Sequence, residues 1–158
     1  MGSNKIMVLG VGNVLMQDEG AGIHFLRELE KRDLPEDTEL LEGGTAGMEL
    51  LYLIEGVDHL VIVDSIEAGA EPGAIFKFKP DDISVMPPEY NVSLHQIGLL
   101  EVLKMGQILD KLPLTVTIFG IQPKIVDWGM ELSPELKTKM PKLVQLVTDE
   151  LYMLAQGA

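Results

Sequence analysis

Two acidic residues and one histidine occupy positions at which a metal site could form. Glu19 follows an apolar segment that stops at Gly10, Asp64 directly follows the apolar run 59–63, and His95 lies where a helix is expected to begin. Carboxylates and a neutral imidazole bind divalent transition metals and leave positions open for water or a substrate group. The sequence therefore predicts that Glu19, Asp64 and His95 form a metal site if the fold gathers them.

The surroundings of His95 favour a neutral, ligand-ready ring. Ser93 and Gln96 have the spacing of a capping box, which puts His95 in the first helical turn. The positive end of the helix disfavours imidazolium there. His24 and His59 are weaker candidates, because His24 belongs to an apolar helical stripe and His59 begins a strand at the opposite end of the sheet. We expect both to be structural or solvent-exposed.

The acidic candidates also have ordinary structural explanations. Asp18 and Glu19 precede a predicted helix, and negative charge at that end complements the helix dipole. We expect one of the two to serve only that purpose. Asp64, at the end of a buried strand, could accept hydrogen bonds from turn or cap N–H groups.

Strand-like and helix-like patterns alternate along the chain, and together they predict how these residues are positioned. The predicted strands are 5–9, 38–41, 59–63, 75–79 and 114–119, and the predicted helices are 23–32, 45–54, 94–110 and 134 onward. Ser133 is the expected N-cap of the last helix, which we expect Pro141 to break or kink. The alternation predicts a three-layer α/β fold with a mostly parallel, twisted sheet, one antiparallel edge strand, and helices on both faces. Ligands of such folds bind beyond the carboxyl ends of the strands.

Length and composition narrow the classes of function. The 158 residues suit one domain, 1–158, although residues 1–3 (MGS) are typical of a cloning remnant and receive no structural weight. The chain has no cysteine, which excludes disulfides, thiolate metal sites and a cysteine nucleophile. Its net charge of −13 argues against nucleic acid and anionic membrane surfaces and favours basic partners. With no apolar stretch of membrane-spanning length and no signal segment, we expect a cytoplasmic protein.

A nucleotide-binding site is the main alternative. The run Gly10-Val11-Gly12-Asn13 imitates the start of a dinucleotide fingerprint, and Glu42 imitates the acid that binds a ribose. Leu15, however, stands where the third glycine belongs, and the acids that follow would repel a pyrophosphate. The two glycines then serve a tight turn.

Recognised hydrolase motifs do not supply a second alternative. The sequence contains no G-x-S-x-G elbow and no H-E-x-x-H helix, and the segment after Asp64 lacks the glycine of an aspartic-protease loop. A hydrolase built on this chain would need a metal.

Five segments together resemble the nickel-iron hydrogenase maturation endopeptidases. They are LGVGNVLMQDEGAG (9–22), GGTAGMELL (43–51), HLVIVDSI (59–66), SLHQIGLLEVL (93–103) and TIFGIQP (117–123). The resemblance covers nearly the whole chain in order. It implies a protease that removes a C-terminal extension from the precursor of the hydrogenase large subunit after nickel insertion. A maturation chaperone that binds the same precursor without cutting it is the alternative.

The resemblance also implies roles for particular residues. The metal-binding positions of the family fall on Glu19, Asp64 and His95, and the nickel belongs to the substrate, where it acts as a recognition signal. Glu42 stands where similar sequences commonly have Asp, so we assign it no direct role beyond orienting the glycine-rich loop or the substrate tail. We expect a monomer. Two mechanisms remain open, in which the nickel either activates water or only positions the substrate.

Overall fold

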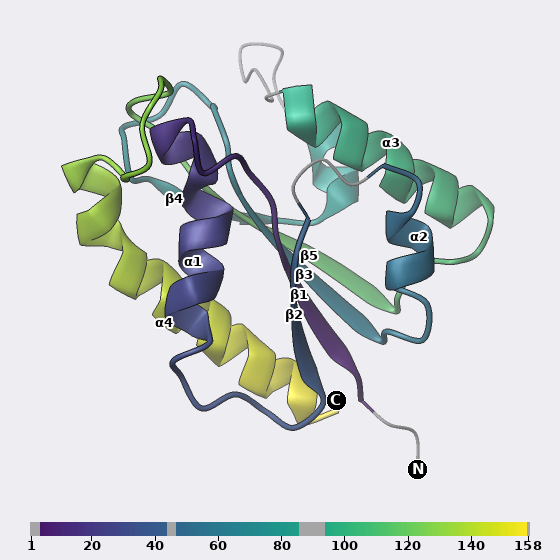
Figure 1. Ribbon diagram of the computed structural model, residues 1–158. Helices are drawn as coiled ribbons and strands as arrows, with labels where there is room; N and C mark the ends of the chain where they lie inside the picture. The colour runs from purple at the N-terminus through teal and green to yellow at the C-terminus, as the bar shows by residue number, and fades with distance from the viewer. Residues whose placement is uncertain (1–3, 44–46, 86–93, 158) are drawn as a thin grey trace.

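The computed structural model describes residues 4–43, 47–85 and 94–157, and its centre is one five-stranded sheet. The strands follow the order β2-β1-β3-β5-β4 (Figure 1). Their bounds are β1 Ile6–Gly10, β2 Thr38–Glu42, β3 His59–Ser65, β4 Ile75–Phe78 and β5 Thr115–Ile121. Strand β4 pairs antiparallel with β5 at one edge, whereas all other neighbours are parallel. The predicted mostly parallel sheet with one antiparallel edge strand is confirmed.

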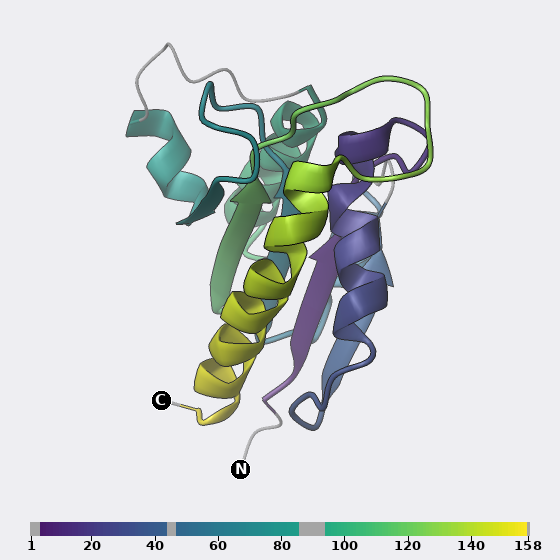
Figure 2. The same cartoon turned by 90° about the vertical axis from the view of Figure 1, so that its left-hand side faces the viewer.

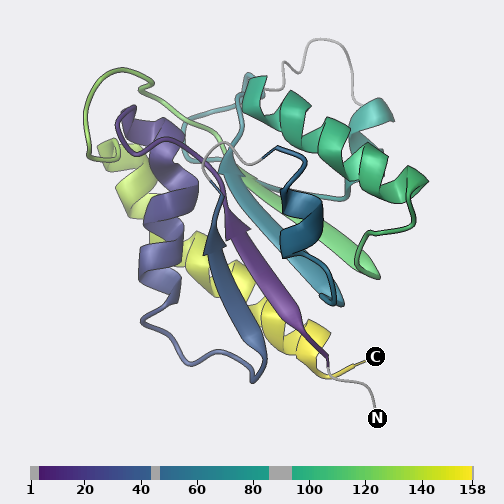
Figure 3. The same cartoon turned by 45° about the vertical axis from the view of Figure 1, so that its right-hand side comes forward.

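Helices cover both faces of this sheet, as the three-layer prediction requires. The helices are α1 Ala21–Leu29, α2 Leu50–Leu53, α3 Leu94–Ile108 and α4 Pro134–Ala155, with 3-10 helices η1 Gln17–Gly20 and η2 Pro80–Val85. Helices α1 and α4 lie on one face, and α2 and α3 lie on the other (Figures 1 and 3). None of the helices in the described ranges is long and apolar enough to cross a membrane.

Alternation along β3 assigns its side chains to two separate cores. Val61 and Val63 belong to the core under α1 and α4, whereas Leu60 and Ile62 belong to the core under α2 and α3. Successive strand residues point to opposite faces, so position 64 falls on the α2/α3 face. Every residue of β3 is buried, and each fully buried aliphatic side chain contributes about 1.5–3 kcal/mol. The register of this strand is therefore strongly determined.

Helix α4 begins as predicted, and it does not end at Pro141. Ser133 is the N-cap and its side chain accepts a hydrogen bond from the Leu136 N–H, with Pro134 at the first helical position. The prediction was a break or a kink at Pro141. The helix continues through that residue, so the break is wrong, and the kink stays a prediction. An interior proline costs about 3 kcal/mol, and the buried row that includes Met140, Leu143 and Val144 packs on the sheet and offsets that cost.

Several element boundaries differ from those predicted. Strand β3 extends two residues past Val63, because Asp64 pairs with Gly120 and Ser65 with Ile121. Asp64 is consequently inside a strand and not in the turn after it. Helix α2 is shorter than the predicted 45–54, and the proposed caps at Thr45 and Ser93 lie outside the described residues.

Candidate active site

The connection after β1 brings Glu19 to the carboxyl end of the sheet. The Val11 N–H donates to the Val63 carbonyl at 2.9 Å, which joins the end of β1 to the end of β3. The chain then forms η1, which carries Glu19 and packs against β3. Asp64 is the sixth residue of that same strand. The structure thus brings the elements bearing Glu19 and Asp64 to one end of the sheet.

Glycines make this close packing possible. A Cβ on Gly12, whose φ is 149°, would lie 2.2 Å from the Glu19 carbonyl oxygen, an oxygen that also accepts the Asn13 N–H at 3.1 Å. A Cβ on Gly22 would lie 2.3 Å from the Val11 carbonyl oxygen. The glycine motif therefore closes the β1–α1 turn around its own backbone. This agrees with the tight turn favoured over a dinucleotide fingerprint.

Asp64 is a buried carboxylate on the α2/α3 side of the sheet. Its side chain is 1% exposed, and its Oδ1 accepts the Ser65 N–H at 2.8 Å. His95 is the second residue of α3, but its side chain lies outside the described part of the structure. Among the side chains that are described, no three His, Cys, Asp or Glu residues form a metal-binding cluster. The set of Glu19, Asp64 and His95 stays a prediction.

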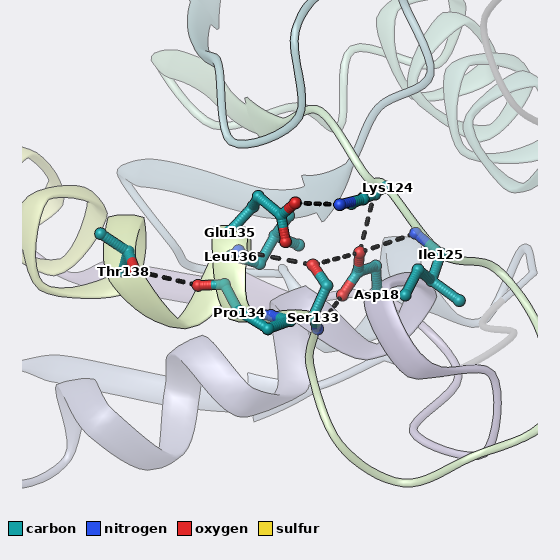
Figure 4. Close-up of polar contacts among 8 residues, drawn as sticks. All are labelled: Asp18, Lys124, Ile125, Ser133, Pro134, Glu135, Leu136 and Thr138. Carbon is teal, nitrogen blue, oxygen red and sulfur yellow. Dashed lines mark hydrogen bonds and ion pairs between the residues drawn. The ribbon is translucent and has the colours of Figure 1, made fainter.

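Asp18, the neighbour of Glu19, is fully buried at the centre of a hydrogen-bond node (Figure 4). One carboxylate oxygen accepts the N–H groups of Lys124 and Ile125 at 2.9 Å each and the Ser133 hydroxyl at 2.7 Å. The other oxygen accepts the Ser133 N–H at 2.7 Å. We call Asp18, Lys124, Ile125 and Ser133 the Asp18 node. It ties η1 to the connection between β5 and α4.

No pattern in the sequence predicts this node. One of the two acids was expected to do no more than complement a helix dipole, and the partners of Asp18 lie 106 to 115 residues away. The only available signal was Ser133, an N-cap in a connection with several backbone donors. Asp18 is therefore a structural acceptor, and Glu19, the half-buried acid beside it, stays the predicted site residue of the pair.

The two remaining histidines have structural positions. His59 lies at the beginning of β3, and its Nδ1 is 2.7 Å from the Thr115 hydroxyl. Burial first and the charge of Arg27 second lower the pKa of His24 below its usual 6.5, although a hydrogen bond with the Met130 backbone opposes them. The half-buried His24 and the hydrogen-bonded His59 agree with the expectation that both are structural or solvent-exposed. Glu42 ends β2 beside Gly10 with its side chain exposed.

Comparison with known proteins accounts for this arrangement. Residues 23–150 match the family model described as hydrogenase maturation protease. This chain belongs to the hydrogenase maturation protease family. The five segments that carried the resemblance thus belong to a peptidase, and the family assignment favours the structural explanation of the glycines over nucleotide binding.

Relatives and solved structures agree with the family assignment. Hydrogenase 2 maturation protease of Escherichia coli is 35% identical over 146 residues, which is 90% of this chain and 88% of that protein. Hydrogenase expression/formation protein HupD of Bradyrhizobium diazoefficiens is 33% identical over 94% of this chain and 78% of its own length. The structure of the hydrogenase maturating endopeptidase HybD from Escherichia coli is similar with a TM-score of 0.83, 33% identity, and coverage of 94% of this chain and 93% of that one. HybD from Thermococcus kodakarensis gives a TM-score of 0.77 at 30% identity, covering 93% and 99%.

Proposed function

We propose that this protease removes the C-terminal extension from the nickel-loaded precursor of a nickel-iron hydrogenase large subunit. The observation that carries the proposal is the packing of η1, with Glu19, against β3, with Asp64. Two acids that are distant in sequence thereby reach one end of the sheet in a member of the maturation protease family. This end is where α/β folds bind their ligands.

In this proposal the nickel arrives with the substrate and is bound by Glu19, Asp64 and His95. Carboxylate and imidazole donors suit a divalent transition metal. Position 64 alternates onto the α2/α3 face, and position 95 stands one helical turn before Leu99, which is buried in the core of that same face. A precursor without nickel would lack the group that these three residues recognise.

Two roles for these residues are consistent with the proposal. A divalent metal held here would polarise the scissile carbonyl, while Glu19 or Asp64 accepts a proton from the attacking water. Alternatively the three residues bind the metal only to hold the substrate tail in an attackable geometry, and positioning provides most of the rate acceleration. We also propose that the protease is a monomer in the cytoplasm.

The test compares nickel-loaded and nickel-free precursor, each mixed with the purified protease, by intact mass over time. We expect a C-terminal fragment only from the nickel-loaded sample, and none from Asp64→Asn with either sample. Asp110→Asn is the matched control, because Asp110 is exposed and its φ of 54° suits asparagine equally well. If the wild type cleaved both samples, the proposal that cleavage requires nickel would be wrong. Binding without any change of mass would favour the non-cleaving chaperone.

A further inference from the structure

The connection between β5 and α4 exposes an unusual group of large apolar side chains. Trp128 is 77% exposed, Met130 65% and Val126 51%, and Leu15 of the adjoining turn is 48% exposed. We call these four residues the Trp128 platform. Single exposed apolar residues are ordinary, but a group on one continuous surface segment marks a contact site. Tryptophan is also among the residues that most often dominate binding energy at protein interfaces.

The backbone beneath the platform is held at both ends and in the middle. The Asp18 node fixes the connection at Lys124, Ile125 and Ser133. Between these points, the Gln17 N–H donates to the Gly129 carbonyl at 2.8 Å and the Gly129 N–H donates to the Leu15 carbonyl at 2.9 Å. Figure 2 shows this connection arching beside η1 and α1 above the start of α4. A platform ordered before binding loses less conformational entropy on association.

The same turn carries the platform and a candidate catalytic residue. Residues Leu15 to Gln17 hold the platform, and Glu19 follows within η1. A partner that rests on the platform is therefore next to the proposed site of cleavage. Asp64, however, belongs to the α2/α3 side, whereas the platform lies beside α1 and α4. The tail that reaches Asp64 and the surface that rests on the platform would be different parts of one substrate.

The charges around the platform indicate what it binds. Asp127 and Glu131 alternate with the apolar residues and are both exposed. The nearby cations Lys124 and Lys137 are paired with Glu135 and Glu131. In a chain of net charge −13, this surface suits a partner with an apolar pocket flanked by basic side chains.

Resting on the proposed function, we infer that the Trp128 platform docks the folded body of the hydrogenase large-subunit precursor, through an apolar pocket with a basic rim. The tail to be cut is then delivered across the end of the sheet to Glu19 and Asp64. Docking and metal recognition are separate contacts in this arrangement.

The test measures docking and cleavage separately for Trp128→Ala. On nickel-loaded precursor in single-turnover cleavage, we expect the half-saturating concentration to rise tenfold or more while the maximal rate stays within twofold. Affinity for nickel-free precursor, which is not cut, should fall by a similar factor. Leu114→Ala is the matched control, because Leu114 is 82% exposed but precedes β5 at the other end of the sheet. Its values should remain within twofold of the wild type.

The outcomes distinguish this inference from the proposed function. If the wild type leaves the nickel-loaded precursor uncut, the proposed function fails, whereas a lower affinity of Trp128→Ala for either precursor still supports docking. Unchanged half-saturation and affinity in Trp128→Ala would overturn the platform even if cleavage is normal. The platform would also be overturned if Trp128→Ala lost affinity for a free peptide of the C-terminal extension. That result would mean that the platform binds the tail and not the folded body of the precursor. Equal melting temperatures of the variants exclude misfolding as the cause.

Discussion

Asp18 and Glu19 are neighbours in the chain, but they belong to different regions of the molecule. Asp18 is fully buried and receives four hydrogen bonds within the Asp18 node. Glu19 is half-buried in η1, beside the strand that carries Asp64. The same chemical group therefore serves a structural purpose in one region, and in the other we predict that it takes part in substrate chemistry. Neither residue type nor position in the sequence separates the two.

The difference lies in where the donors come from. A buried carboxylate is tolerated when hydrogen bonds satisfy its oxygens, and bonds to an ionised acceptor are roughly twice as strong as neutral ones. Three backbone N–H groups and one hydroxyl supply them to Asp18. The node thus explains Asp18 through folding alone, and we predict that Glu19 acts on the substrate instead. Substitutions at the two acids and at their neighbours test whether they differ in this way.

Asp18→Ala should have the largest effect, a loss of about 3–5 kcal/mol in the free energy of unfolding, because several donors each lose an acceptor at a cost of about 1–3 kcal/mol. The substitution leaves the buried Ser133 N–H and the partly buried N–H groups of Lys124 and Ile125 without their acceptor. Urea unfolding followed by circular dichroism measures the loss. Glu28→Ala, an exposed residue of α1, is the control and should change stability by less than about 0.5 kcal/mol. A loss below about 1 kcal/mol for Asp18→Ala would mean that the node is not structural.

Glu19→Gln should have the opposite effect to Asp18→Ala, because we expect it to change cleavage and not stability. We expect little change in the free energy of unfolding but a fall of about 10²-fold or more in cleavage of the nickel-loaded precursor, because the substitution removes the carboxylate that we propose binds the metal or accepts a proton. Single-turnover cleavage by intact mass measures the rate. Glu55→Gln, at an exposed position, serves as the matched control. If Glu19→Gln keeps the wild-type rate but loses several kcal/mol of stability, Glu19 is structural like its neighbour.

Ser133→Ala should have an intermediate effect confined to stability, a loss of about 1–2 kcal/mol. The hydroxyl both donates to Asp18 at 2.7 Å and caps α4 by accepting the Leu136 N–H at 3.4 Å. Ser133→Thr retains the hydroxyl and should recover most of the loss. Equal destabilisation by both substitutions would point to packing and not to the hydroxyl.

The sequence predicted the fold well, because the signals for it are local. Hydrophobic patterns located all the strands and the long helices in the described ranges, and the lysines of 75–79 indicated an edge strand. Pro141 misled the prediction because propensity is local, whereas the packing of α4 on the sheet is tertiary.

The site was predictable only in part. Chain order and parallel strands were enough to bring Glu19 and Asp64 to one end of the sheet. The separation of Asp18 from Glu19 depends on donors more than 100 residues away, and no local pattern encodes them. The Trp128 platform escaped notice for the same reason, since a loop tryptophan indicates neither burial nor exposure until its backbone contacts are known.

A substitution at Glu135, which pairs with Lys124 at the solvent-exposed side of the Asp18 node, should have the smallest effect on stability. A hydrogen bond from Lys124 first, and the backbone N–H of Glu135 second, lower the pKa of Glu135 below its usual 4.5. Because the folded pKa is below the unfolded one, the unfolded chain binds more protons in acid. The contribution is present above pH 4.5 and is lost as the pH falls through the folded value.

Glu135→Gln should therefore be slightly less stable than the wild type at pH 7 and indistinguishable from it in strong acid. Solvent screens this ion pair, so the difference at pH 7 should be much smaller than that of Ser133→Ala. Urea midpoints at pH 7, 5 and 3 measure it, with Glu131→Gln, another lysine-paired and exposed residue, as the control. The opposite result is a difference in urea midpoint between Glu135→Gln and the wild type that grows as the pH falls. It would mean that Glu135 is a buried member of the Asp18 node and not an exposed neighbour of it.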